Sequence, residues 1–257
     1  MDIFIFTYEK DAALLPLCIS HAARHGRVVL VDEAAAPATD EAGALAMGAT
    51  EYVRTTFDRR GNLNGAPCVR GMLEVYRDHG QDEWVMQVDS NLLLFRPDLL
   101  LHECERYDMI GQAAGWSDAY RNFTPVLYAS GGGMLLRRRM IPRMLTLMDK
   151  PDIVARIESG KGFSDHVLTI LCRMSGGATK LLAHEGAALR EGVFCRVAWH
   201  KFEGGCNDMC TSAAAVHIYP KAAPGNTPEE RTAAVLAAMQ QHADTWAPQP
   251  EREQGEE

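Results

Sequence analysis

An apolar run at positions 84–88 ends on Asp89, and Ser90 and Asn91 follow it directly. In open α/β sheets, ligands bind beyond the carboxyl ends of the strands. Carboxylate and amide oxygens at such a strand end suit a hard divalent cation, which in turn can bridge a diphosphate. The pattern therefore predicts a Mn²⁺ or Mg²⁺ site at Asp89. The alternative interpretation is that Asp89 is only a turn residue, as Asp often is after a strand.

The segments before Asp89 follow the order of a parallel α/β sheet. Apolar runs at 2–7 and 27–32 predict strands, and positions 11–25 between them have an apolar helical face. Strand, helix and strand within about 30 residues form a βαβ unit. The alternation continues with a strand at 51–56, a helix that Pro67 starts and Gly80 ends, and a strand at 83–89.

Beyond residue 100 the alternation is less regular. We expect strand pieces at 126–130 and 133–136, a helix from Ser164 that ends at Gly176, and short strands at 180–183 and 215–219. The run Thr227-Pro228-Glu229-Glu230 is a capping box and predicts a last helix to about residue 242. We therefore expect one α/β domain at 1–246 and a disordered acidic tail at 247–257.

Composition narrows the class of protein. The chain has 257 residues, 47% of them hydrophobic, which is enough for a real core. A formal net charge of -8 argues against nucleic acid as a partner. The sequence has no apolar stretch as long as a membrane span, and its start has no basic, signal-like region, so we expect a cytoplasmic protein. Seven cysteines, an odd number, favour reduced thiols over a disulfide framework.

The stretch at 84–99 resembles the DxD region of GT-A glycosyltransferases, in which a strand ends in Asp-x-Asp. Four other stretches resemble that family in the same order, at 3–9, 130–133, 164–166 and 216–218. The resemblance implies a single GT-A-like, Rossmann-related domain with a mixed, mostly parallel sheet flanked by helices. It also implies transfer of a sugar, of the hexosyltransferase type, from a nucleotide-diphosphate donor to a carbohydrate, lipid-linked or protein acceptor.

The resemblance also implies roles for particular residues. Asp89, Asn91 and His217 would hold the cation. Asp165, at the start of a helix, would be the catalytic base if the reaction inverts the sugar, whereas a retaining reaction would not need this base. The residues expected to bind the donor are Thr7, Tyr8, Asp32, Asn62, Asn64, Arg70, Ser90, Gly131 and Gly132. Two of these expectations also have physical grounds, since a helix N-terminus after Asn64 favours a diphosphate and glycines let the backbone approach a sugar. Plain caps, turns and surface charges explain the same residue types.

One position departs from the family pattern. An amide, Asn91, stands where the second carboxylate is expected, and it adds no charge to a cation site. This leaves a non-catalytic nucleotide-sugar-binding module as a second hypothesis and a nucleotidyltransferase as a third. Four residues, Cys195, His200, Cys206 and Cys210, carry the atoms of a structural zinc site, but their spacing is not that of paired CxxC motifs, and buried free thiols are the alternative.

Overall fold

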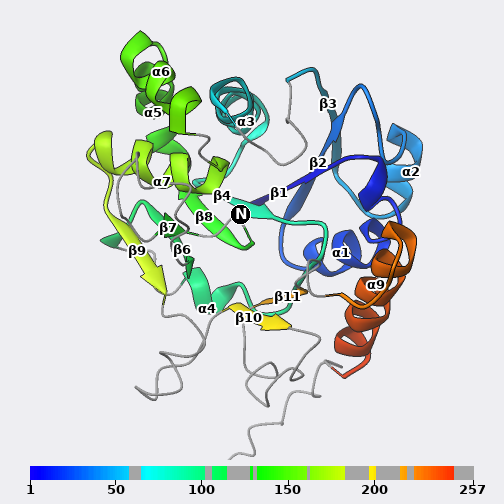
Figure 1. Cartoon of the computed structure of the whole chain (residues 1–257). Coiled ribbons are helices and arrows are strands. Elements are labelled where there is room, and N and C mark those ends of the chain that lie inside the picture. The colour runs from blue at the N-terminus through cyan, green and yellow to red at the C-terminus, as the bar shows by residue number, and fades with distance from the viewer. Residues whose placement is uncertain are drawn as a thin grey trace, which may run out of the picture.

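The computed structural model of the chain describes residues 1–57, 65–101, 106–114, 128–129, 132–160, 163–182, 197–200, 215–218 and 223–245 (Figure 1). None of the helices in these ranges is both long and apolar enough to cross a bilayer.

The first half of the chain builds four parallel strands in the order β3-β2-β1-β4. The strands are β1 (Asp2–Thr7), β2 (Arg27–Glu33), β3 (Glu51–Thr55) and β4 (Trp84–Val88), and the connecting helices are η1 (Glu9–Asp11), α1 (Leu15–Ala22), α2 (Glu41–Ala46) and α3 (Ala66–His79). The strand order reverses between β1 and β4, because the chain moves outward from β1 to β3 and returns to the other side. Such a switch point is where open α/β sheets bind ligands.

The second half extends the same sheet beyond β4. Its strands are β8 (Met134–Arg137), β6 (Met109–Ala114), β7 (Tyr128–Ala129) and β9 (Thr179–Leu182), which pairs with β6. Strands β8 and β7 run against the other six in this eight-stranded sheet, so the predicted mixed, mostly parallel sheet is confirmed. The helices of this part of the chain precede β6 or lie between β8 and β9 in the sequence. They are α4 (Asp98–Leu101), η4 (Arg138–Met140), α5 (Ile141–Met148), α6 (Pro151–Gly160) and α7 (Ser164–Met174).

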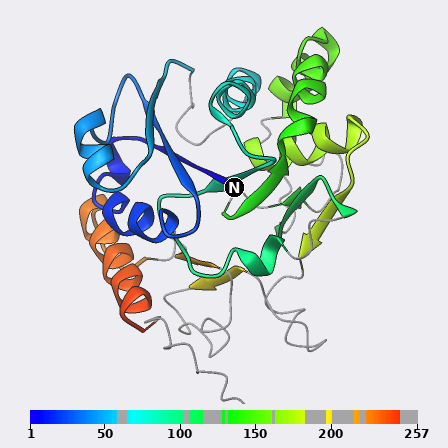
Figure 2. The same cartoon turned by 180° about the vertical axis from the view of Figure 1, so that it is seen from behind.

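A second, three-stranded sheet lies next to the end of β4. It contains β5 (Leu92–Leu94), β11 (Ala215–Ile218) and β10 (Val197–His200), in the order β10-β11-β5. Three residues separate the end of β4 from the start of β5. Strand β5 pairs antiparallel with β11, with Leu92 opposite His217. Figure 2 shows these short strands from behind, below the main sheet.

Alternation along β1 explains how the helices cover both faces of the main sheet. Ile3 and Ile5 point to a core that includes α1, while Phe4 and Phe6 point to a core that includes α3. All four side chains are buried. The last helix, α9 (Pro228–Thr245), packs beside α1, as both views show. Helices α5 and α7 join α3 on the opposite face.

The start of α9 confirms the predicted capping box. Glu230 N donates to Thr227 Oγ1 over 3.2 Å, and Thr227 N donates to Glu230 Oε2 over 3.2 Å. The two bonds satisfy amide groups that the first helical turn leaves open.

Candidate functional site

The turn after β4 holds the Asp89 backbone in place and leaves its carboxylate accessible. Leu92 N donates to Asp89 O over 3.0 Å, and Cys18 Sγ, on α1, lies 3.5 Å from the same oxygen. The Asp89 side chain is 36% exposed, whereas Ser90 and Asn91 are buried. A rigid turn therefore presents one accessible carboxylate at the switch point of the sheet.

Strand β11 brings His217 to this turn across 126 positions of sequence. His217 Nε2 lies 3.2 Å from Asn91 Oδ1 and 3.5 Å from Asp89 Oδ2. Burial lowers the pKa of His217, and the Asp89 charge acts in the opposite direction. A lowered pKa keeps the imidazole neutral near pH 7, and neutral imidazole is the form that binds a metal. The structure thus brings together all three side chains predicted to hold a cation.

The distances from His217 Nε2 to the other two side chains are close to those between two ligands of one divalent cation. Ligands about 2.1 Å from an octahedral ion lie roughly 3 Å from one another. The two separations from His217 Nε2, 3.2 and 3.5 Å, are close to that value. Within the described ranges, no group of three or more His, Cys, Asp or Glu side chains is arranged to hold a metal. The set at Asp89 has two such side chains, and the amide of Asn91 is the third member.

Gly132 lies against the ring of His217. A Cβ atom at this position would be 2.7 Å from His217 Nδ1, so a residue with a side chain would displace the ring. The predicted donor residue Gly132 therefore borders the Asp89 turn through His217. Its neighbour Gly131 lies outside the described residues.

The end of β1 contains a buried hydroxyl group. Thr7 is fully buried, and its Oγ1 has no hydrogen-bond partner among the residues that the structure describes. Tyr8 follows with an extended backbone and is partly buried. Because β1 and β4 are parallel neighbours, these residues and Asp89 follow the same edge of the sheet. Both residues remain predicted donor contacts.

Asp32 at the end of β2 organises a loop. Its two carboxylate oxygens accept bonds of 2.9–3.1 Å from the amides of Glu33, Ala38 and Thr39 and from Tyr52 Oη. The side chain is fully buried. This geometry favours a structural role for Asp32, and donor binding by this residue stays a prediction.

Arg70 and the N-terminus of α3 are also engaged within the protein. Arg70 Nη2 donates to Met148 O over 2.6 Å and to Asp149 Oδ1 over 2.7 Å, which caps the end of α5. Ala66 N, the first amide of α3, donates to Glu158 Oε1 over 2.7 Å. These contacts favour structural roles for Arg70 and this helix end. Asn62 and Asn64, which precede the helix, lie outside the described residues.

Asp165 is the second residue of α7, at the start of the helix as the sequence predicted. The helix begins at Ser164, and Phe163 precedes it as the N-cap without a side-chain bond. Asp165 Oδ1 accepts a bond of 2.9 Å from His166 N, and the carboxylate is partly buried. A carboxylate in the first helical turn is favoured by the helix dipole. A catalytic role for Asp165 stays a prediction.

Most of the residues predicted to form a zinc site lie outside the part of the chain that the structure describes. Cys195, Cys206 and Cys210 lie outside the described residues, and of His200 only the backbone, in β10, is described. The three described cysteines, Cys18, Cys68 and Cys172, are buried. Burial raises the pKa of the Cys172 thiol to about 12, so it is protonated at neutral pH.

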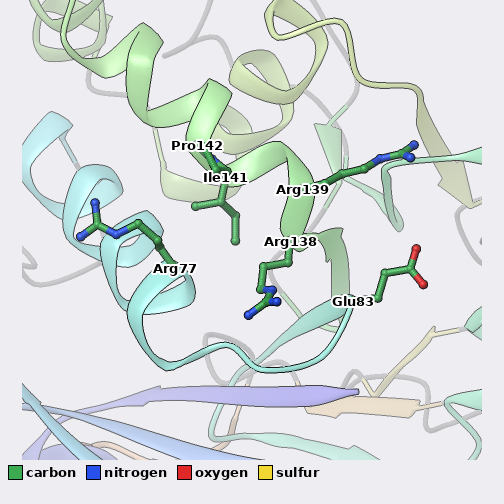
Figure 3. Close-up of a pocket in the computed structure, with 6 residues that line it drawn as sticks. All are labelled: Arg77, Glu83, Arg138, Arg139, Ile141 and Pro142. Atoms are coloured by element: carbon green, nitrogen blue, oxygen red, sulfur yellow. The ribbon is translucent and has the colours of Figure 1, made fainter.

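A cavity of about 550 Å³ lies at the opposite end of β4 (Figure 3). It is lined by Arg77, Glu83, Arg138, Arg139, Ile141 and Pro142. Its three guanidinium groups point away from one another in the figure, and each is engaged within the protein. Arg77 bonds to Asp78, Arg138 donates to Gly80 O, and Arg139 bonds to Asp108. This cavity is therefore separate from the site at Asp89, and its arginines have structural partners.

No model of a known protein family matches the sequence, and no curated protein sequence is similar to it. Solved structures of similar fold were found. The galactosyltransferase LgtC, in complex with donor and acceptor sugar analogs, superposes with a TM-score of 0.58 at 15% identity, over 98% of each chain. An active-site mutant of LgtC gives 0.54 at 12% identity, again over 98% of each chain. The glycosyltransferase GlyE of Streptococcus pneumoniae gives 0.49 at 11% identity, over 95% of this chain and 62% of that chain.

The two likenesses to LgtC, together with the sheet topology, define the fold. The chain has the GT-A fold of nucleotide-sugar glycosyltransferases, as a single-sheet α/β core with a small second sheet at the end of β4. The predicted fold class is thereby confirmed.

Proposed function

We propose that this protein is a glycosyltransferase that moves a sugar from a nucleotide-diphosphate donor to an acceptor. The observation that carries the proposal is the convergence of Asp89, Asn91 and His217 at the switch point of a GT-A fold. A scaffold that binds no ligand would not need an accessible carboxylate, an imidazole and a glycine that makes room for the ring at this point.

Asp89 and His217 are the proposed holders of a Mn²⁺ or Mg²⁺ ion, and Asn91 Oδ1 faces the same point. When bound, such an ion neutralises charge on the leaving diphosphate. The protein residues hold the ligand atoms in position for this ion. The turn at Asp89 is fixed by backbone bonds, so the carboxylate needs no reorganisation when the donor binds.

The end of β1 is the proposed place of the nucleotide. Thr7 Oγ1 offers a buried hydroxyl that no described group uses, and Tyr8 offers a ring on which a base can stack. LgtC, whose structure was solved with donor and acceptor sugar analogs, shares the fold and so makes a sugar-nucleotide donor the first class to test. Two further donor contacts are proposed: Ser90, which follows Asp89, and Gly132, which lies against the ring of His217.

One specific observation favours a second candidate. Asn91 removes a charge from the cation site, which is consistent with a module that binds a nucleotide sugar without transferring it. The two candidates share donor binding and differ in turnover.

A thermal-shift panel tests donor binding. UDP or GDP with Mn²⁺ is expected to raise the Tm more than ATP or NAD does, because the site is proposed for a diphosphate. At 100 times Kd, a bound ligand adds about 2.7 kcal/mol to the free energy of unfolding. The matched control omits Mn²⁺ and adds a chelator. If no nucleoside diphosphate raises the Tm at millimolar concentration with Mn²⁺ or Mg²⁺ present, the proposed function is wrong.

A further inference from the structure

We propose that Asn91 is a positioning residue whose side-chain amide ties the Asp89 turn to β11, and that this tie requires an amide rather than a carboxylate. The inference rests on the proposed function and deepens it. It assigns a reason to the one position where the sequence departs from the Asp-x-Asp pattern, and it reverses the effect expected from restoring that pattern.

Two hydrogen bonds join Asn91 to Ile218. Asn91 Nδ2 donates to Ile218 O over 2.5 Å, and Ile218 N donates to Asn91 O over 3.0 Å. The side-chain bond determines the orientation of the Asn91 amide, because a flipped amide would place Oδ1 against the carbonyl oxygen of Ile218. The side chain of Asn91 therefore adds one hydrogen bond to those that join β5 and β11.

The same orientation determines what faces His217. With Nδ2 held by Ile218 O, Asn91 Oδ1 points to His217 Nε2 at 3.2 Å. His217 is the residue before Ile218 and lies opposite Leu92 in the register of β5 and β11. One amide thus fixes both the strand that carries His217 and the atom that faces its ring. Gly132 lies on the Nδ1 side of the ring, where a residue with a side chain would displace it.

A carboxylate cannot make this tie. It has no N–H group, so one of its oxygens would lie against Ile218 O, and both atoms would be hydrogen-bond acceptors. Asn91 is only 7% exposed, so water cannot relieve that contact. The Asn91→Asp change therefore has two effects that act against each other. The added charge favours cation binding, whereas loss of the hydrogen bond to Ile218 O moves His217 away from Asp89.

The two effects predict different orders of Mn²⁺ affinity for the unaltered protein and its two variants. If charge decides, Asn91→Asp binds most tightly, then the unaltered protein, then Asn91→Ala. If position decides, the unaltered protein binds most tightly, and Asn91→Asp is no better than Asn91→Ala. We expect the second order, with both variants about 10- to 100-fold weaker, the usual loss when a group that orients a metal ligand is removed.

The experiment titrates the full-length protein and both variants with Mn²⁺ alone and measures free Mn²⁺ by electron paramagnetic resonance. Asn226→Asp is the matched control, because it adds the same charge at an exposed position just before α9. The control is expected to leave the Mn²⁺ affinity unchanged. An Asn91→Asp protein that fails to fold while Asn91→Ala folds would agree with the proposal, since it shows that a carboxylate is not tolerated there.

Hydrogen exchange in the absence of metal gives a second, independent measurement. The amide of Ile218 is expected to exchange at least 10-fold faster in Asn91→Ala than in the unaltered protein, because the side-chain tie no longer holds the strand end. Asn91→Asp that binds Mn²⁺ more tightly, or unchanged exchange at Ile218, would overturn the inference. If the unaltered protein binds no Mn²⁺, the proposed cation site is wrong, and the exchange rate alone decides whether Asn91 ties the two strands.

Discussion

Asp89→Asn is expected to lower kcat for sugar transfer by about 10²–10³-fold and to leave the fold intact. The accessible carboxylate of Asp89 lies with His217 at the switch point, so its loss removes charge from the proposed cation site. The side chain is 36% exposed and the turn is held through the backbone oxygen of Asp89, so the change costs the core little. Turnover with a nucleotide sugar and the Tm measured on the same preparation check both parts.

The matched control for this variant is Asp98→Asn. Asp98 is an exposed carboxylate nine positions further on, paired with Arg96 at 3.0 Å. An exposed ion pair contributes little to stability, so neither turnover nor Tm should change by much. Asp89→Asn with full turnover and unchanged metal dependence would mean that Asp89 is only a turn residue.

Asp165→Asn is expected to lower kcat by about 10²–10⁴-fold if the reaction inverts the sugar and Asp165 is its general base. The affinity for the donor should change little, because the proposed nucleotide position is at the end of β1. The readout is kcat measured together with the Kd of the nucleoside diphosphate, since a base acts on the first and not on the second.

The alternative for Asp165 is that its charge only stabilises α7. In that case the variant loses about 0.3–1 kcal/mol of stability and keeps its turnover. Asp152→Asn is the matched control, because Asp152 is the second residue of α6 as Asp165 is of α7. Equal effects of the two variants on both Tm and turnover would show that Asp165 is a helix-end charge and not the base.

The first half of the fold could be predicted because its physical signals are local. Strands β1, β2 and β4 are runs of mostly apolar residues, which is typical of strands buried on both faces. Helix α9 has a capping box and a proline at its first position, so its start was evident. Helices α2, α4, α5 and α6 and strands β5, β6 and β10 were not predicted. Pro142 and Pro151, which resemble breaks in a sequence, are in fact tolerated in the first turns of two helices.

The candidate site shows where sequence patterns stop being informative. Asp89 could be found from its strand, but its approach to His217 depends on a pairing of β5 with β11 that spans more than 120 positions. Only the family resemblance pointed to it. Asp32 and Arg70 have residue types that suit a ligand equally well, and their use within the protein depends on partners such as Tyr52 and Asp149. The amide tie of Asn91 has no sequence signal, because it requires the position of a backbone carbonyl.

The most direct test of the central claim is release of the nucleoside diphosphate from a nucleotide sugar. Purified protein with Mn²⁺ is incubated with UDP- and GDP-sugars, one at a time, and free UDP or GDP is quantified by ion-exchange chromatography. A glycosyltransferase is expected to release the diphosphate from one of these donors, even if only slowly to water, and Asp89→Asn should not. A protein that binds a nucleotide sugar in the thermal-shift panel but returns every donor unchanged, at the same level as Asp89→Asn, would contradict a transferase and leave a binding module.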